Sequence, residues 1–358
     1  MARPVNDTSS NAFHQLRASV QRNCHLADAE HARDYSLCIY LLKMREYYRW
    51  EKGLPLTHTI SREDVGDWVM NREELWDGMQ EQEFQPIPVG TAHFDPFDEA
   101  GINDAIEANG LVYSSGLGRF GQAHFFLARL ESVRRFDGLT VYVSASEYAR
   151  DLTAPPAMAL GRRIFVRRES LRRSLWEMVD ESKWSKATQP ITRALACFGG
   201  DGDNDVEGVI KRMTDGAIDT LTWHETGEVA AGGDLDPRWG EMLATITGIR
   251  TELCIRAVRD HLADCLITLP ALLERGDSGL IHLYFANLQG MRKELFPRLA
   301  AAYDRWLRDG ALGEFRDLIP GARVHWQCVA KEMLAIFDEG PEDPDSVIDE
   351  LIDERARY

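Results

Sequence analysis

The sequence predicts an α+β protein that is mainly helical: a C-terminal helical bundle packed with a long N-terminal helix, plus a small antiparallel β insert. Apolar residues recur at helical spacing through most of the second half of the chain. Runs of β-branched and aromatic residues broken by glycines are confined to residues 111–167. With 358 residues and 44% hydrophobic content, the chain is long enough for a large core. The expected segments are residues 1–90 (N-terminal helices), 91–168 (β insert), 169–338 (bundle) and 339–358 (acidic tail).

The N-terminal segment is expected to contain two helices. The first runs over about residues 28–51 and ends at Gly53 and Pro55. The second begins at Ser61, where Ser61 and Asp64 resemble a capping box, and continues to about residue 83. We expect the first helix to pack on the C-terminal bundle, because the bundle alone would leave its apolar stripes exposed.

The middle of the chain predicts a β meander. Expected strands cover residues 111–115, 123–136, 139–146 and 162–167, with glycines between them. The glycines at 116, 118 and 121 match the dinucleotide-binding fingerprint by letter only, because a strand rather than a helix follows them. A glycine-rich hairpin is therefore the interpretation of this stretch.

From residue 169 the pattern is helical almost to the end. Helices are expected near residues 169–187, 205–231, 237–275, 278–309 and 321–338, with Gly or Pro in the turns between them. Residues 338–358 hold nine acidic and two basic side chains, which predicts a solvated tail with a short helix over residues 346–355.

Bulk properties narrow the function classes. The net charge of −17 makes nucleic acid an unlikely global partner. No apolar run approaches 18 residues, so no membrane association is expected. Six scattered cysteines without a C-x-x-C pair, and a start without an apolar signal segment, predict a cytoplasmic protein with reduced thiols.

Ionisable residues stand where two helices of the bundle should be apolar. Along residues 205–231 an apolar stripe continues into His224 and Glu228. Along the next long helix a second stripe continues into Asp260 and Asp264. Carboxylates are rarely buried unless they are paired or bind a metal. The four side chains are therefore expected to converge in one polar pocket, about 10 Å across.

These residue types predict a metal centre. A histidine and a carboxylate four residues apart on one helix face can bind the same ion, and carboxylates on a facing helix can complete or bridge the site. His224, Glu228, Asp260 and Asp264 are the expected ligands, with His282 from a third helix. Iron is the favoured ion, and manganese or zinc also suits such ligands. The further candidates for the catalytic pocket are Glu225, Tyr35 and Glu46.

Two other interpretations of these residues stay open. They can form a buried salt-bridge network with arginines, for which the candidates are Arg45, Arg49, Arg250 and Arg256. They can also serve as acid and base in a metal-independent enzyme.

An arginine cluster ends the β insert. Residues 162–173 contain six arginines in twelve positions. Arginine suits carboxylate and phosphate recognition, so the cluster predicts docking of an anionic protein partner, and a solvated sheet face is the alternative. This surface supports a second function class, a non-catalytic binding or scaffold protein.

Several phrases resemble those of an uncharacterised family of soluble bacterial proteins. They are Asn23-Cys24-His25, Leu41-Leu-Lys-Met-Arg-Glu-Tyr-Tyr-Arg-Trp-Glu51, Gly118-Arg-Phe-Gly-Gln122 and Trp223-His-Glu-Thr-Gly-Glu228. The bundle also resembles, more loosely, ferritin-like and haem-oxygenase-like di-iron proteins, which implies inward-facing carboxylates and histidines. The sequence lacks an E-x-x-H pair on each of two helices, so a mononuclear and a dinuclear site both stay open. We therefore expect a helical-bundle metalloenzyme, an iron-dependent oxidase or oxygenase acting on a small molecule.

Overall fold

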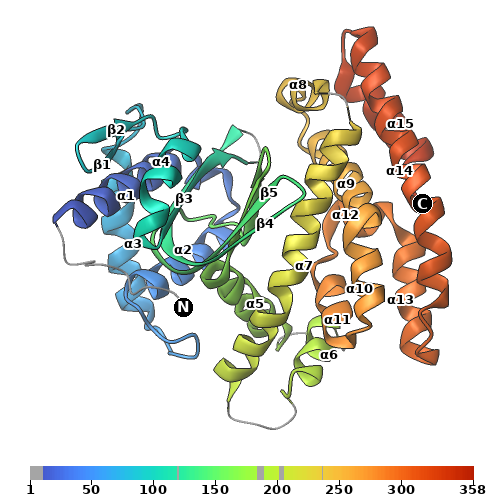
Figure 1. Cartoon of the computed structure of the whole chain (residues 1–358), viewed down its shortest axis with the longest axis horizontal. Helices are drawn as coiled ribbons and strands as arrows, with labels where there is room; N and C mark the ends of the chain where they lie inside the picture. The colour runs from blue at the N-terminus through green and yellow to red at the C-terminus, as the bar shows by residue number, and fades with distance from the viewer. Residues whose placement is uncertain (1–10, 119–120, 184–188, 201–204, 236) are drawn as a thin grey trace. The chain divides into compact units, whose positions relative to one another are not determined.

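The chain forms two compact units, Met1–Trp176 and Glu177–Tyr358. The computed structural model describes residues 11–118, 121–183, 189–200, 205–235 and 237–358 (Figure 1). The first unit combines helices with two sheets, and helices are the only regular elements among the described residues of the second. The expected class, α+β and mainly α, is confirmed. No helix among the described residues is long and apolar enough to cross a membrane.

The first unit begins with helices and then builds its sheets. Its elements in chain order are α1 (Asn11–His31), a 3-10 turn (Ala32–Asp34), α2 (Leu37–Glu51), α3 (Arg62–Asp77), β1 (Ile87–Val89), β2 (Ala92–Phe94), α4 (Glu99–Ile106), a second 3-10 turn (Glu107–Asn109), β3 (Leu111–Leu117), β4 (Ala123–Phe136), β5 (Leu139–Arg150), β6 (Ala157–Leu160) and β7 (Arg163–Arg167). Helix α5 (Arg168–Ser182) follows β7 directly.

The single helix expected over residues 28–51 is wrong. The chain is already helical from Asn11, and α1 ends at His31. Tyr35 and Ser36 have extended backbone angles, so a new helix starts at Leu37. The buried residues Leu16, Val20, Cys24 and Ala27 recur at helical spacing, so the sequence does contain a signal for the earlier start.

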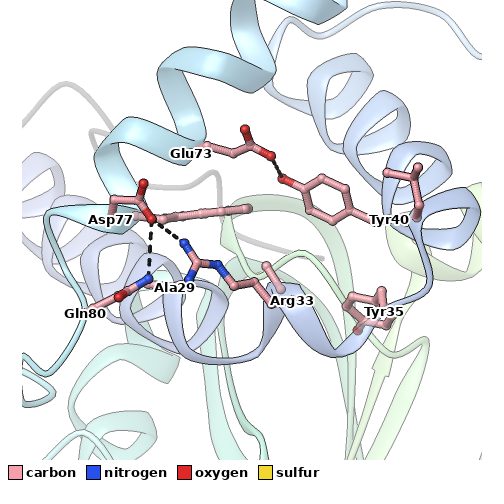
Figure 2. Close-up of a pocket in the computed structure, with 10 residues that line it drawn as sticks. Ala29, Arg33, Tyr35, Tyr40, Glu73, Asp77 and Gln80 are labelled. Atoms are coloured by element: carbon pink, nitrogen blue, oxygen red, sulfur yellow. Dashed lines mark hydrogen bonds and ion pairs between the residues drawn. The ribbon is translucent and has the colours of Figure 1, made fainter.

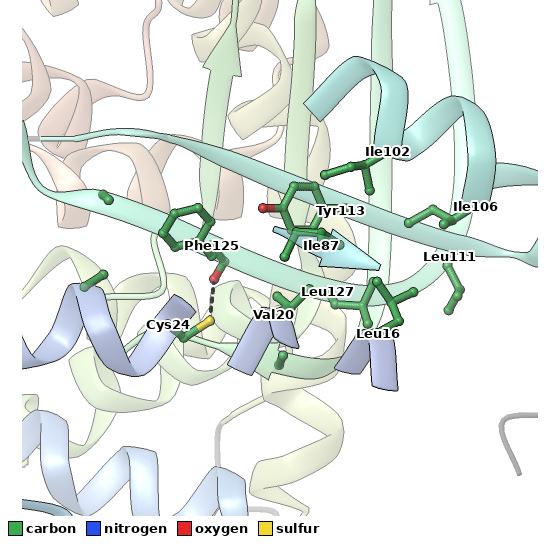
Figure 3. Close-up of a cluster of buried hydrophobic side chains, with 13 residues drawn as sticks. Leu16, Val20, Cys24, Ile87, Ile102, Ile106, Leu111, Tyr113, Phe125 and Leu127 are labelled. Carbon is green, nitrogen blue, oxygen red and sulfur yellow. Dashed lines mark hydrogen bonds between the residues drawn. The ribbon is translucent and has the colours of Figure 1, made fainter. Parts of the chain in front are cut away.

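Helix α1 packs on the strands of its own unit. It contacts β4, β5 and β1. Figure 3 shows Leu16, Val20 and Cys24 of α1 beside Phe125 and Leu127 of β4. The thiol of Cys24 donates to the carbonyl oxygen of Phe125, 3.2 Å away. This contact satisfies a buried strand carbonyl at the centre of the core.

The main sheet is mixed rather than wholly antiparallel. Its strand order is β3-β4-β5-β7-β6, and β7 runs parallel to β5, with Val141 opposite Ile164. The expected antiparallel insert is therefore wrong at β7. Strand β6 lies at the edge of the sheet. The next strand, β7, is inserted between β5 and β6 and is therefore an inner strand. Ile164, Phe165 and Val166 are all buried, as is usual for a parallel strand covered on both faces.

The second unit is a bundle of helices with short connections. Its elements are α6 (Pro190–Cys197), α7 (Val206–Asp234), α8 (Arg238–Thr245), α9 (Ile249–Ala263), a π-helical turn (Asp264–Thr268), α10 (Leu269–Arg275), α11 (Ser278–Asn287), α12 (Gly290–Leu295), α13 (Pro297–Asp309), α14 (Gly313–Glu339) and α15 (Pro344–Arg355). Two expected helices are subdivided: the one over residues 237–275 breaks at Gly248, and the one over residues 278–309 breaks before Gly290 and Pro297. Helix α14 starts eight residues earlier than expected and contains Pro320. Helices α4 and α6 were not predicted.

The acidic C-terminal segment is docked rather than solvated. Ile348 and Ile352 of α15 are buried, and the helix contacts α14 and α9. Asp345 accepts a hydrogen bond from the amide of Gly248, 2.7 Å away, at the N-terminus of α9. Its negative charge lies at the positive end of that helix, which stabilises the contact. The short helix was correctly expected, but its acidic side chains serve as anchors.

Candidate metal centre

Helices α7 and α9 approach each other closely beside Gly227. A Cβ atom on Gly227 would overlap the carbonyl oxygen of Ala263, so only glycine permits this separation. The π-helical turn that begins at Asp264 also contacts α7. This approach brings His224 and Glu228, on either side of Gly227, opposite the end of α9.

Three side chains come together at this point with ligand atoms facing one another. One potential ligand atom each from His224, Glu228 and Asp260 lies within 4.8 Å of the other two. Nε2 of His224 is 3.5 Å from Oε1 of Glu228. The three side chains are 18–19% exposed, so they lie at the margin of the bundle rather than at its centre. Imidazole and carboxylate groups at such separations can hold a divalent metal after small side-chain rotations.

Asp264 contacts His224 at Nδ1, the ring nitrogen that does not face Glu228. Its Oδ1 lies 2.8 Å from Nδ1 of the imidazole, and its Oδ2 accepts hydrogen bonds from Tyr284 and Arg292. Asp264 is fully buried and is not one of the three converging groups. The π-helical turn sets its direction, and such turns are frequent at functional sites. Asp264 therefore orients the imidazole so that Nε2 faces Glu228.

Two arginines balance the carboxylates. Arg259 lies 2.9 Å from Oε2 of Glu228, and Arg292 pairs with Asp264 and approaches Asp260 to 3.7 Å. Burial and the Arg292 charge lower the pKa of His261 to about 3, so this imidazole adds no positive charge. Its Nε2 lies 2.8 Å from the carbonyl oxygen of Arg292. Arg292 is thus fixed by its backbone as well as by its guanidinium.

The arginine partners proposed from sequence are wrong. Arg45 and Arg49 pair with Glu46, Arg250 pairs with Asp349 and Asp353, and Arg256 pairs with Glu252. Arg259 was not among these candidates, but its long side chain reaches Glu228. Arg292 and Tyr284 were missed altogether, since no spacing pattern along α11 or α12 points to them.

Burial and the neighbouring charges together shift the pKa values of the carboxyl groups. Burial, and then the neighbouring Glu228 carboxylate, raises the pKa of Glu225 to about 8. Burial and Glu228 also raise the pKa of Asp260 to about 6. Burial opposes ionisation of Glu228 too, but Arg259 and His224 outweigh it and lower its pKa to about 2. Two carboxyl groups therefore resist ionisation in a cluster whose other members are ionised.

His224 has the opposite shift. Burial disfavours its charged form, but attraction to Asp264 and hydrogen bonds to Asp264 and Glu228 raise its pKa well above the usual value. Burial likewise disfavours the Asp264 carboxylate, but Arg292 and His224 hold its pKa well below the usual range. The imidazolium and the carboxylate therefore form an ion pair at neutral pH.

Replacing Glu225 by glutamine tests the raised pKa. The unfolded chain ionises Glu225 near pH 4.3, whereas the folded protein holds the proton to about pH 8. The contribution of the protonated Glu225 to the free energy of unfolding is therefore fully present below about pH 4 and is lost as the pH rises to about 8. In EDTA-treated protein, the fall in the free energy of unfolding between pH 5 and 8 should shrink by on the order of 3 kcal/mol in Glu225→Gln. Urea unfolding of the wild type and the variant at several pH values measures this difference. Glu241→Gln, at a side chain 68% exposed, is the control, and parallel curves for all three proteins would refute the assignment.

The remaining candidates have other partners. Nδ1 of His282 is 2.8 Å from the hydroxyl of Tyr303, and His282 is not among the three converging groups. Tyr35 and Glu46 belong to the first unit. The hydroxyl of Tyr35 lies 2.5 Å from that of Thr153, and Glu46 accepts from Arg49 at 3.0 Å. Tyr35 and Glu46 therefore have their contacts within their own unit.

The arginine cluster of residues 162–173 is engaged within the fold. Arg167 is 1% exposed and makes two hydrogen bonds to Glu147, at 3.0 and 2.9 Å. Arg168 pairs with Glu131, and Arg173 is buried beside Glu169. Arg163 pairs with Glu99. The alternative of a solvated sheet face is therefore wrong for the buried Arg167 and Arg173, because carboxylates of the sheet and of helices α4 and α5 pair with the cluster.

Comparisons with known proteins bear on the family alone. The model of the N-terminal domain of a family of unknown function, DUF6866, matches residues 15–167. The model of the C-terminal domain of the same family matches residues 172–355. No curated protein and no solved structure matches the chain. The two matches follow the two compact units, and the expected resemblance to an uncharacterised family is confirmed. The chain belongs to the DUF6866 family and contains both of its domains.

Proposed function

We propose that the second unit carries a mononuclear metal centre and that the protein is a metal-dependent enzyme acting on a small molecule. The observation that carries this proposal is the convergence of ligand atoms from His224, Glu228 and Asp260 within 4.8 Å. The hydrogen bond between Nδ1 of His224 and the Asp264 carboxylate supports it, because a histidine that binds a metal through one ring nitrogen commonly donates its other ring N–H to a carboxylate.

The charges of the cluster favour a divalent cation. Four carboxyl groups, Glu225, Glu228, Asp260 and Asp264, face two permanent cations, Arg259 and Arg292. With a neutral His224, full ionisation of the four would leave two negative charges, which a divalent ion offsets. Without the ion, the same balance requires protons on Glu225 and on His224, in agreement with their raised pKa values. Metal binding is therefore expected to release protons.

The ligand set narrows the choice of ion and reaction. One imidazole and two carboxylates suit iron or manganese, and zinc also accepts them. Three protein ligands leave coordination positions for a substrate or for oxygen, so an iron-dependent oxidase or oxygenase is the reaction class we favour. In this scheme Arg259 and Arg292 fix the carboxylates. Glu225, buried beside Glu228 and holding its proton to about pH 8, is the group suited to proton transfer.

Elemental analysis of protein purified without a histidine tag tests the proposal. We expect up to one iron or manganese per chain, retained on dialysis. The variants His224→Ala and Asp260→Asn should lose it while keeping the circular dichroism of the wild type. Asp219→Asn, on the same helix α7 but paired with Arg275 at the surface, should retain it. Metal-free wild type, after reconstitution with Fe(II), Mn(II) and Zn(II), would exclude the metal centre.

A metal-independent acid–base enzyme is the second candidate. The raised pKa values of Glu225 and Asp260 favour it, because such groups exchange protons near neutral pH. The same elemental analysis separates the two candidates, since this enzyme binds no stoichiometric metal in any form of the protein.

A further inference from the structure

An open pocket of about 390 Å³ lies in the first unit, between the end of α1, the start of α2 and the C-terminal half of α3 (Figure 2). Its volume falls in the range of small-molecule sites. Ala29 and Ala32 of the α1 region and the buried Trp76 of α3 supply its apolar lining. No residue of the candidate metal centre lines it, so a ligand bound there would be independent of the proposed function.

Aromatic side chains line this pocket from two elements. Tyr35 and Tyr40 come from the linker and helix that follow α1, and Trp76 comes from α3. The electron-rich faces of such rings attract cations. The chain uses this attraction on one of them, because the ammonium group of Lys43 lies 5.3 Å from the centre of the Tyr35 ring.

The pocket also carries a carboxylate without a cationic partner. Glu73 accepts a hydrogen bond from the hydroxyl of Tyr40, 2.9 Å away, and within the described part of the chain no ion pair reaches it. The second carboxylate, Asp77, is occupied by the guanidinium of Arg33 at 2.6 Å. Figure 2 shows the two acidic groups on the same side of the pocket. The lining charges therefore sum to −1, located at Glu73.

We propose that this pocket binds a small organic cation, an ammonium or guanidinium group on a compact apolar body. Its charge would lie between Glu73 and the ring of Tyr40, and its apolar part would cover Trp76 and the two alanines. Charged pairing and cation–π contact both distinguish such a ligand from a neutral molecule of the same shape. A basic side chain of a partner protein has the same chemistry, but the limited volume favours a free small molecule.

Matched cation and neutral pairs test the proposal by isothermal titration calorimetry on the full chain. The probes are choline against 3,3-dimethyl-1-butanol and benzylamine against benzyl alcohol. At least one cation should bind with a dissociation constant below about 1 mM, and its neutral partner should bind at least about tenfold more weakly. Added salt should weaken binding, because Glu73 is exposed.

Three variants locate the binding site. Glu73→Gln should weaken binding of the cation about tenfold or more. Ala32→Phe should abolish binding by filling the pocket, and Glu74→Gln, at the adjacent exposed position outside the lining, should leave it unchanged. Equal binding of the neutral partners, unchanged binding in Glu73→Gln, or no binding of either cation up to about 10 mM would overturn the proposal. Binding of a lysine-containing apolar tripeptide amide, without binding of choline or benzylamine, would also overturn the proposal.

Discussion

Replacing Asp264 by asparagine is expected to lower the free energy of unfolding of the second unit by about 3–5 kcal/mol. The substitution keeps the shape of the side chain and removes its charge. Arg292 and the protonated His224, both less than a quarter exposed, then remain together without their shared counter-ion. Urea unfolding of EDTA-treated protein, with hydrogen exchange of α9 and α11 amides to assign the loss to this unit, measures the effect.

An exposed aspartate in the same unit provides the matched control. Asp353 pairs with Arg250, but its side chain is 61% exposed, so Asp353→Asn should cost less than about 1 kcal/mol. The wild type should also lose stability in acid. Because Arg292 and His224 lower the pKa of Asp264, its contribution is present above pH 4 and disappears as the pH falls further. Equal effects of the two substitutions would show that Asp264 does not hold the cluster together.

Helical spacing predicted which carboxylates meet His224 but not what each one does. The positions of His224, Glu228, Asp260 and Asp264 follow from the rotation of 100° per residue along two adjacent helices. The division between three converging groups and one supporting group depends on the π-helical turn at Asp264. No local sequence pattern predicts a π-helical turn at this position, so the orienting role of Asp264 was not predicted.

Contacts between distant segments account for the other misses. Arg292 and Tyr284 reach Asp264 from α12 and α11, and the rotation of those helices relative to α9 is set by packing. The parallel pairing of β7 with β5 is likewise a matter of strand order, which alternation along one strand does not encode. The sequence therefore predicted the polar faces of α7 and α9 and four strands of the main sheet, but not the boundaries of several helices or the neighbours of each element.

Arg167 is the position at which the structure reverses the sequence-based expectation most strongly. Substitution in an exposed arginine cluster would barely alter folding, but Arg167 is buried and its guanidinium is bonded to Glu147 through two nitrogens. Ser170 donates to the same carboxylate at 2.7 Å, and the guanidinium stacks over Phe126 at 4.3 Å. Arg167→Gln should therefore destabilise the first unit by about 3 kcal/mol, since it leaves the buried Glu147 carboxylate with only the more distant Arg150, 3.9 Å away, as a cationic partner.

The adjacent arginine separates loss of charge from loss of this buried pair. Arg168 pairs with Glu131 at side chains that are 27% and 35% exposed, so Arg168→Gln should cost about 1 kcal/mol or less. Hydrogen exchange at β5 and β7 would assign the losses to the first unit. Similar costs for Arg167→Gln and Arg168→Gln would mean that the cluster is solvated after all.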